Sequence, residues 1–329
     1  MAKIAPSVTR LWFHIDPANS VNYVDLSLAA SAANRRFYRQ STTWAVAGMS
    51  LHTGSGTVGQ FVTSKVPDSW VAKNAHTKAK RLWMKSQEQV LENEPSIKAR
   101  YNDFKVYLDK YMPTATIQEQ SSSPTDPAAT NTILLPVDQL NYPAKTGEWI
   151  YSQLQLPNAG GSLAPDEVTM HMVGNDFTSG PTDSRGIIHG YALSRQRPQK
   201  FDPSVPTQDG WMTDVFDVAD LNEEIREDVS ENNDQPPYRV GEYDGTDEFY
   251  PGGENNSPGA ALHARSIVSG TTVGGKTHVE GGMFHCGLIK FEWDFEDPAR
   301  AGDPPSDANM YLAIDLVPGR YKGYLTEAY

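Results

Sequence analysis

Two groups of basic residues carry the sharpest chemical signal in the sequence. The first is the stretch NRRFYRQ, in which Arg35, Arg36 and Arg39 are interleaved with the aromatic residues Phe37 and Tyr38. A guanidinium group binds a phosphate with two parallel hydrogen bonds, and an aromatic ring stacks on an unpaired base. Single-stranded nucleic acid needs both kinds of contact. NRRFYRQ is therefore a candidate nucleic-acid-binding or subunit-interface segment.

The second group lies on a stretch with helical periodicity. Residues at three- and four-residue spacing predict an amphipathic helix over about 68–93, with Asp68 as its N-cap and Pro95 as its stop. The predicted inward stripe consists of Val71, Ala75, Ala79, Leu82, Ser86 and Val90. The basic side chains on this helix are Lys73, His76, Lys78, Lys80, Arg81 and Lys85. We expect Lys73, His76 and Lys80 to lie away from the stripe.

An alternative interpretation applies to both groups. A charged helix face is usually only solvated, and the arginines can equally pair with acidic side chains of a neighbouring copy. A nucleic-acid contact made by so few cations would be modest and would weaken with added salt. Both interpretations stay open at the level of the sequence.

Acidic residues supply the best candidate metal site. Residues 209–256 contain 15 acidic and 2 basic side chains, and Asp244, Asp247 and Glu248 in GEYDGTDEF offer oxygen ligands of the kind that Ca²⁺ prefers. Their spacing does not match the helix-loop-helix calcium motif, and acidic loops are commonly plain solvated surface. Calcium at a subunit contact is the only cofactor that the sequence suggests.

The sequence predicts that the protein is not an enzyme. Its eight histidines show neither the HExxH nor the HxH spacing, and it contains no GxSxG motif and no phosphate-binding loop. His278 and His285 bracket Gly281–Gly282, which is interpreted as a turn, and strand alternation places His285 and Cys286 on opposite faces. Cys286 is the only cysteine, which excludes an internal disulfide and a cysteine-rich zinc site.

Charge is divided unevenly along the chain. Residues 1–110 contain 15 Lys and Arg against 8 Asp and Glu, a net charge of +7, and residues 111–329 contain 13 against 33, a net charge of −20. The two values add to the overall −13. Opposite charges on one subunit favour the association of copies in a fixed orientation. The pattern is typical of an assembling protein.

No segment has the length and apolarity of a membrane span. The N-terminal sequence MAKIAPSVTR lacks the apolar core of a signal peptide, and no run approaches about 18 apolar residues. The sequence therefore predicts a soluble protein with no membrane partner.

Turn-rich composition and alternating segments predict an all-β chain. Gly and Pro number 26 and 23, and apolar alternation predicts about eleven short strands. The strand candidates are Val8–Ile15, Thr43–Thr53, Thr57–Lys65, Tyr101–Leu108, Thr132–Val137, Glu148–Leu156, Val168–Val173, Gly186–Arg195, Ala261–Val268, Met283–Phe295 and Met310–Val317. The second and third of these flank Gly54–Gly56 and are expected to form a hairpin.

Shorter features complete the predicted organisation. Asp25 is the expected cap of a short helix over Leu26–Tyr38, and Trp12, Trp44, Trp70 and Trp83 are expected core residues. Residues 113–131 are predicted to be a polar loop and residues 209–258 an acidic, surface-exposed insertion. The predicted architecture is a jelly-roll β-sandwich, a single domain over residues 1–329 with long loop insertions and one amphipathic helix.

Three stretches of the chain resemble the coat proteins of small single-stranded DNA viruses, of the circular Rep-encoding type known from environmental sequences. They are YVDLSLAASAANRRFYRQSTTWAVAG at Tyr23–Gly48, the entry VP-x-SWV-x-x-NA into a tryptophan-bearing helix at Val66–Trp83, and AIDLVPGRYKGYLTEA at Ala313–Ala328. Together they span about 60 of the 329 residues, and their order agrees along the whole chain.

The resemblance implies a major capsid protein with a jelly-roll fold, whose copies form a small icosahedral shell around single-stranded DNA. It implies a location in the virion, inward-facing or interface roles for NRRFYRQ and the basic helix, and an exterior position for the acidic insertion. Many such proteins begin with a long Arg/Lys-rich arm, whereas MAKIAPSVTR has only Lys3 and Arg10. Genome contact would then come from the folded clusters or from another protein.

Two alternatives belong to other functional classes. An accessory or spike protein of the virion would form a trimer or pentamer without closing into a particle. A carbohydrate-binding or carbohydrate-cleaving β-sandwich would be a monomer or dimer that uses Trp149 or Trp211 against a sugar. The sequence identifies neither a host nor a receptor.

Overall fold

The computed structural model describes residues 7–16, 21–54, 57–93, 103–117, 131–138, 144–145, 147, 149–156, 166–177, 183–195, 259–269, 275–296 and 310–329. The acidic segment 209–258 and most of the polar segment 113–131 lie outside these residues.

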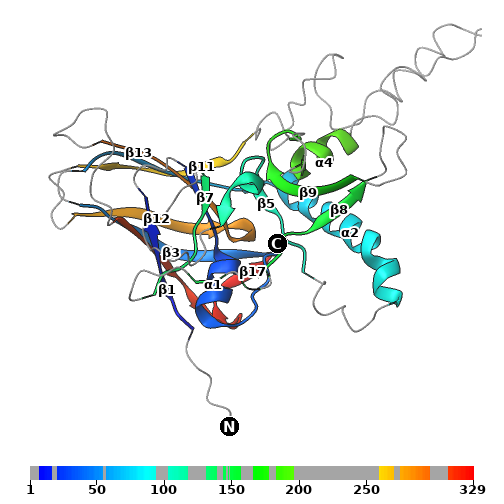
Figure 1. Ribbon diagram of the computed structural model, residues 1–329, viewed down its shortest axis with the longest axis horizontal. Coiled ribbons are helices and arrows are strands. Elements are labelled where there is room, and N and C mark those ends of the chain that lie inside the picture. Colours follow the sequence, from blue (N-terminus) through cyan, green and yellow to red (C-terminus); the bar gives the residue numbers. More distant parts are fainter. Residues whose placement is uncertain are drawn as a thin grey trace, which may run out of the picture.

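The described chain is mostly β, and two largely antiparallel sheets form its larger part (Figure 1). The first sheet has the order β1 (Arg10–Ile15), β14 (Met310–Leu316), β3 (Thr42–His52) and β12 (Lys276–Phe284), and β17 (Thr326–Ala328) also pairs with β3. The second has the order β11 (Ala261–Val268), β4 (Val58–Lys65), β13 (Leu288–Glu296), β2 (Val21–Asp25), β7 (Asn131–Ile133) and β6 (Thr116–Ile117). A hairpin of β15 (Pro318–Gly319) and β16 (Gly323–Tyr324) lies near the end of the chain.

Alternating side chains form the core between these two sheets. On β1, Leu11, Phe13 and Ile15 are buried while Arg10 and Trp12 are exposed, as the two-residue repeat of a strand requires. On the opposite sheet, Phe61 stacks on Phe291 with ring centroids 5.4 Å apart. Period-two alternation in the sequence therefore identified β1, β3, β4, β11, β13 and β14, but it missed β2 and β12. The predicted strand Met283–Phe295 wrongly joins the end of β12 to β13 across the turn His285–Gly287.

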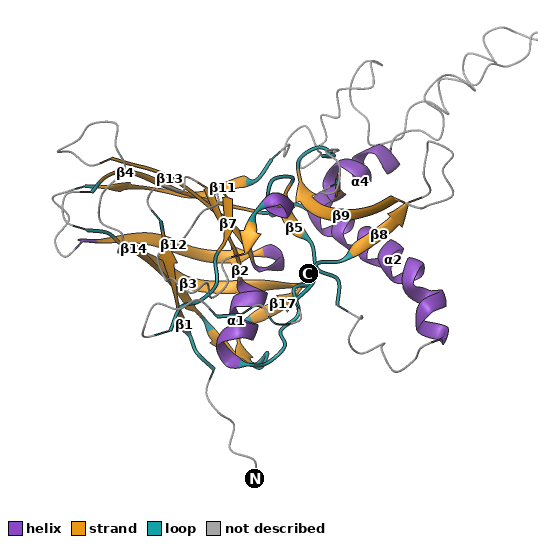
Figure 2. Ribbon diagram, viewed as in Figure 1, coloured by secondary structure: helices purple, strands orange, loops and turns teal. Residues whose placement is uncertain are grey.

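A third, smaller sheet and two helices lie beside one end of the sandwich (Figure 2). Its central strand β9 (Asp166–Val173) pairs in parallel with β5 (Tyr107–Asp109) and β10 (Ser184–Gly186) and antiparallel with β8 (Gln153–Leu156). Helices α2 (Trp70–Asn93) and α4 (Ile187–Arg195) contact each other next to this sheet. A second hydrophobic cluster joins this layer to the sandwich end, through residues such as Val71, Met172 and Leu288.

The end of the sandwich that carries this layer is defined by strand register. Asp25 at the end of β2 pairs with Leu288 at the start of β13, and Lys65 at the end of β4 pairs with Ile289. The connections β2–β3, β4–β11 and β12–β13 therefore leave the sandwich at one end. The first of them contains α1 (Leu26–Asn34), and the third is the short 3-10 turn His285–Gly287.

The predicted hairpin between Thr43–Thr53 and Thr57–Lys65 is wrong. Both strands exist as β3 and β4, but β3 pairs with β12 and β14 while β4 pairs with β11 and β13. The chain therefore passes from one sheet to the other between the end of β3 at His52 and the start of β4 at Val58. The local turn signal predicted the reversal of the chain, whereas pairing with strands distant in sequence decided which sheet each strand joins.

The predicted strand Gly186–Arg195 is also wrong. Of the residues in this predicted strand, only Gly186 lies in a strand, as the last residue of β10. Residues 187–195 form the helix α4. The described part of the chain thus has three α-helices rather than one amphipathic helix and one short helix. A short apolar run such as IIHGYAL fits a buried strand or a helix equally well, and packing against α2 decided between them.

The predicted N-cap of α1 is confirmed. The Asp25 Oδ1 atom accepts hydrogen bonds from the backbone N–H groups of Ser27 at 2.9 Å and Leu28 at 3.2 Å. The helix ends at Asn34, four residues before the predicted Tyr38, because Arg35 adopts a left-handed conformation with φ 52°. All of NRRFYRQ except Asn34 therefore lies in the loop that follows the helix.

Helix α2 occurs where predicted, but its inward face is displaced. Ala72, His76 and Trp83 are buried, whereas Leu82 is 52% exposed. The predicted stripe followed only the apolar residues and so missed a histidine on the buried face. Its cap also differs, because Ser69 Oγ accepts from Ala72 N–H at 3.2 Å.

The four tryptophans predicted to be core residues divide into two pairs. Trp44 and Trp83 are buried, while Trp12 and Trp70 are 37% and 42% exposed.

Of the helices described, none is long and apolar enough to cross a membrane.

Candidate nucleic-acid interface

The loop that carries Arg35, Arg36 and Arg39 follows α1, and all three side chains are exposed. Its backbone is held on both sides. Ser31 accepts from Arg36 N–H through its carbonyl at 3.3 Å and from Tyr38 N–H through its hydroxyl at 3.0 Å. From the C-terminal hairpin, Tyr321 Oη accepts from Arg39 N–H at 3.1 Å. These hydrogen bonds hold the backbone of the loop in one conformation.

Residues 37–40 alternate between exposed and buried positions. Tyr38 and Gln40 are fully buried, while Phe37 is 46% exposed. Gln40 Oε1 accepts from Val106 N–H at 2.6 Å, and Gln40 Nε2 donates to Val106 O and to Asp25 Oδ2, each at 2.9 Å. The buried pair anchors the loop and leaves Phe37 and the arginines directed outward.

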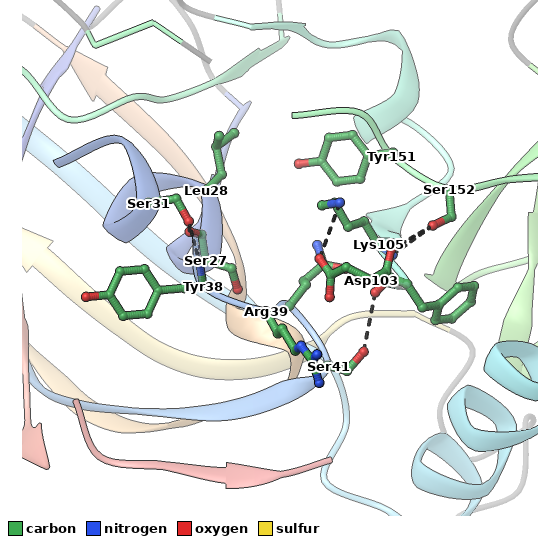
Figure 3. A network of polar contacts seen from close by, with 12 residues as sticks. Ser27, Leu28, Ser31, Tyr38, Arg39, Ser41, Asp103, Lys105, Tyr151 and Ser152 are labelled. Atoms are coloured by element: carbon green, nitrogen blue, oxygen red, sulfur yellow. Dashed lines mark hydrogen bonds and ion pairs between the residues drawn. The ribbon is translucent and has the colours of Figure 1, made fainter. Parts of the chain in front are cut away.

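Phe37 lies beside a second aromatic residue and above a buried ammonium group. The centroids of the Phe37 and Trp149 rings are 6.0 Å apart, with 45° between the ring planes. Lys105 Nζ lies 5.4 Å from the Phe37 centroid and 4.9 Å from the Trp149 centroid. Lys105 is itself ion-paired with Asp103 at 3.3 Å, and both residues are buried (Figure 3).

Each of the two predicted basic groups has one cation near enough to act electrostatically on the same carboxylate, that of Asp103. Burial raises the pKa of Asp103, and the positive charges of Lys105, Arg39 and Lys80 act in the opposite direction. Arg39 comes from the loop and Lys80 from α2. The structure therefore brings one member of each group to the same place (Figure 3 shows Arg39 near Asp103).

The cations of α2 are divided between two faces. At 100° per residue, Lys73 and Lys80 lie on one flank, whose charges act on His285 and on Asp103. Lys78, Arg81 and Lys85 lie on the other flank, where Lys78 Nζ is 5.7 Å from the Tyr191 ring centroid of α4. His76, predicted to lie away from the core, is buried, and burial lowers its pKa to about 3.

Sequence reasoning found the loop but missed the residues that surround it. Lys105 and Asp103 come from the segment before β5, and Lys322, whose Nζ donates to Phe37 O at 2.6 Å, comes from the C-terminal hairpin. Trp149 was predicted as a residue for sugar binding or for contacts between subunits, not as a neighbour of this loop. No local pattern connects these segments to NRRFYRQ, because they are far apart in sequence.

A buried carboxylate joins the loop to the Trp149 segment. Asp25 Oδ2 accepts from Gln40 Nε2 at 2.9 Å and from Tyr151 Oη at 3.2 Å. Burial is the largest influence on this carboxyl group and raises its pKa from 3.8 to about 6, although the hydrogen bonds from Leu28, Gln40, Ser27 and Tyr151 oppose the shift.

We expect Asp25 to make the protein more stable at mildly acidic pH. Its folded-state pKa lies above its ordinary value, so between about pH 4 and pH 6 the folded protein holds a proton that the unfolded chain has released. The Asp25 contribution to the free energy of unfolding therefore falls by about 2–3 kcal/mol as the pH rises through this window. Urea denaturation at half-unit pH steps measures it.

The Asp25→Asn variant serves as the comparison, because asparagine is an equally good N-cap and does not titrate. In this variant we expect the free energy of unfolding to lack the decline between about pH 4 and pH 6 that comes from Asp25. Tyr151→Phe removes a donor that favours the ionised carboxylate, so its decline should extend to higher pH. An unchanged slope in Asp25→Asn would contradict this assignment.

The predicted calcium ligands Asp244, Asp247 and Glu248 lie outside the described residues. Among the residues that are described, no group of three or more His, Cys, Asp or Glu side chains is placed to hold a metal ion. Calcium at a subunit contact stays a prediction.

His285 and Cys286, in the turn between β12 and β13, are both buried. His285 Nδ1 is 2.8 Å from Thr43 Oγ1, and its Nε2 is 3.0 Å from Asp68 Oδ1. Cys286 is fully buried, and burial raises the pKa of its thiol. Gly281–Gly282, interpreted as a turn, instead lies within β12.

Comparison of the chain with protein-family models, curated proteins and solved structures finds no match. The fold and the Arg35–Arg39 loop are therefore the features that bear on function.

Proposed function

We propose that this chain is the major coat protein of a small virus, and that its copies assemble into an icosahedral shell enclosing single-stranded DNA. In this proposal the protein resides in the virion and its partners are other copies of itself and the genome. It is a structural protein rather than an enzyme.

Strand order is the observation that carries the proposal. In chain order, the eight principal sandwich strands are β1, β2, β3, β4, β11, β12, β13 and β14, which we number one to eight. One sheet then has the order 1-8-3-6 and the other 2-7-4-5. Successive strands alternate between the sheets except at four and five, β4 and β11, which pair with each other in one sheet. This order supports a jelly roll, the two-sheet arrangement of paired Greek keys that viral coat domains share with lectins.

The position of the inserted elements supports the same proposal. All three connections that leave one end of the sandwich come together beside α1 and the C-terminal strands. The long one, between β4 and β11, holds α2, α4 and the third sheet. A sandwich elaborated at one end keeps its other surfaces for contacts between copies. The charge division, +7 for residues 1–110 and −20 for 111–329, favours such contacts in a fixed orientation.

The oligomeric state of the full chain tests the proposal against its alternatives. Size-exclusion chromatography with light scattering is expected to give a species of about 60 copies or a multiple, since a closed shell needs icosahedral symmetry. A discrete trimer or pentamer at every salt concentration would support an accessory or spike protein instead. A monomer or dimer that binds sugar, and loses binding in Trp149→Ala, would support the carbohydrate-binding alternative.

A further inference from the structure

We propose that the loop Arg35–Arg39, together with Trp149, is a binding site for single-stranded nucleic acid in which an unpaired base stacks on Phe37 and neighbouring phosphates bind the loop arginines. This inference rests on the proposed function, because it names the surface through which a coat subunit contacts the enclosed strand.

The stacking surface is the outer side of the Phe37–Trp149 pair. Phe37 is 46% exposed, and Lys105, which is buried, lies on the inner side of both rings. Asp103 pairs with that ammonium group, so the charge beneath the rings is compensated. Trp149 is partly buried and packs beside Phe37, so Phe37 supplies the exposed ring face of this pair. A planar base fits such a surface, and stacking on it is independent of base identity.

Cations flank Phe37 along the loop. Arg35, Arg36 and Arg39 are exposed, and within the described residues neither the Arg35 nor the Arg39 guanidinium forms an ion pair. Lys322 adds a positive charge held at the Phe37 carbonyl. Guanidinium forks with free donors beside an exposed ring match the alternation of phosphate and base along a single strand.

The rigidity of the loop favours binding. Hydrogen bonds from Arg36, Tyr38 and Arg39 fix the backbone, and buried Tyr38 and Gln40 anchor it. Little conformational freedom is then lost when a ligand binds. In a duplex the faces of the bases are already stacked on one another, so Phe37 gives an advantage only to an unpaired strand.

The competing occupant is an acidic segment of a neighbouring copy. Carboxylates would pair with Arg35 and Arg39 in much the same way as phosphates, but they would not stack on Phe37. A test that separates the ring from the cations therefore distinguishes the two occupants.

The experiment measures binding of a fluorescent oligothymidylate to the full-length protein at several salt concentrations. A duplex of equal length and a polyglutamate peptide serve as competitors. We expect the single strand to bind more tightly than either competitor. We expect Phe37→Ala to weaken binding about tenfold or more with an unchanged salt slope. We expect Arg35→Gln and Arg39→Gln each to reduce the slope of log K against log salt by about 0.7.

Arg265→Gln is the matched control. It removes one exposed arginine from β11, at the edge of the second sheet, and we expect it to bind as the unmodified protein does. Phe37→Leu keeps an apolar side chain of similar size without a stacking face, and its folding can be checked by circular dichroism. Wild-type affinity in Phe37→Ala, equal binding of the duplex, or equal competition by polyglutamate would overturn the inference.

Assembly is measured in parallel on the same preparations. Particles that form normally, but whose dissociated subunits do not bind the oligonucleotide, would refute this site and leave the coat-protein proposal standing. Oligonucleotide binding by a chain that never forms particles would refute the coat-protein proposal and leave the site.

Discussion

Replacing Trp44 by alanine is expected to lower the free energy of unfolding by about 3–5 kcal/mol. Trp44 is fully buried on β3, and its ring lies 5.9 Å from that of Tyr38 and 5.4 Å from that of Tyr324. The Trp44 side chain thus packs the sandwich core against the loop Arg35–Arg39 and against the C-terminal hairpin. Urea denaturation followed by circular dichroism, at constant subunit concentration, measures the loss.

Two further variants make this prediction specific. Trp44 Nε1 has no hydrogen-bond acceptor among the described residues, so Trp44→Phe should cost much less than the alanine variant. Trp12→Ala removes the same side chain from the exposed face of the same sheet and should change stability by about 1 kcal/mol or less. Equal losses in Trp12→Ala and Trp44→Ala would show that the core is placed incorrectly.

Gly281→Ala is expected to be strongly destabilising, with a cost of about 3 kcal/mol or more. A Cβ atom at this position would lie 2.3 Å from Val46 O and 2.5 Å from Ala47 C and O. These are backbone atoms of the neighbouring strand β3, so no side-chain rotation relieves the overlap. The pairing of β12 with β3 would have to open, which a fall in the denaturation midpoint and in soluble yield would report.

Gly190→Ala is the control for this prediction. Gly190 is an exposed residue of α4, and a Cβ atom there would meet nothing within 4 Å. Alanine should stabilise this helix by about 0.5–1 kcal/mol, because glycine loses more backbone freedom on folding. Two variants with the same chemical change should therefore shift stability in opposite directions. A neutral Gly281→Ala would contradict the β3–β12 pairing.

The predominantly β character could be predicted from the sequence because alternation is a local property. It is visible in RLWFHI and MYLAIDL, which form β1 and β14. Pairing is not local, and the β3–β4 hairpin failed for that reason. The strand prediction over Gly186–Arg195 failed because a short apolar run does not distinguish the two structures. The stripe on α2 was displaced because His76 is buried there against Phe104 and Tyr329.

The candidate site could be predicted only in part. The composition of NRRFYRQ identified the loop, and the cap at Asp25 correctly located the helix before it. Lys105, Trp149 and Lys322 meet the loop only after the chain has folded. The composition of α2 predicted one group of cations, whereas Lys78, Arg81 and Lys85 lie on a different face of the helix from Lys80.

The most direct test of the coat-protein proposal is electron microscopy of the purified full-length chain, with absorbance at 260 and 280 nm measured on the same fractions. We expect closed shells of uniform diameter that carry nucleic acid. A uniform population of monomers or small rings, unchanged across salt concentration and pH, would contradict the proposal.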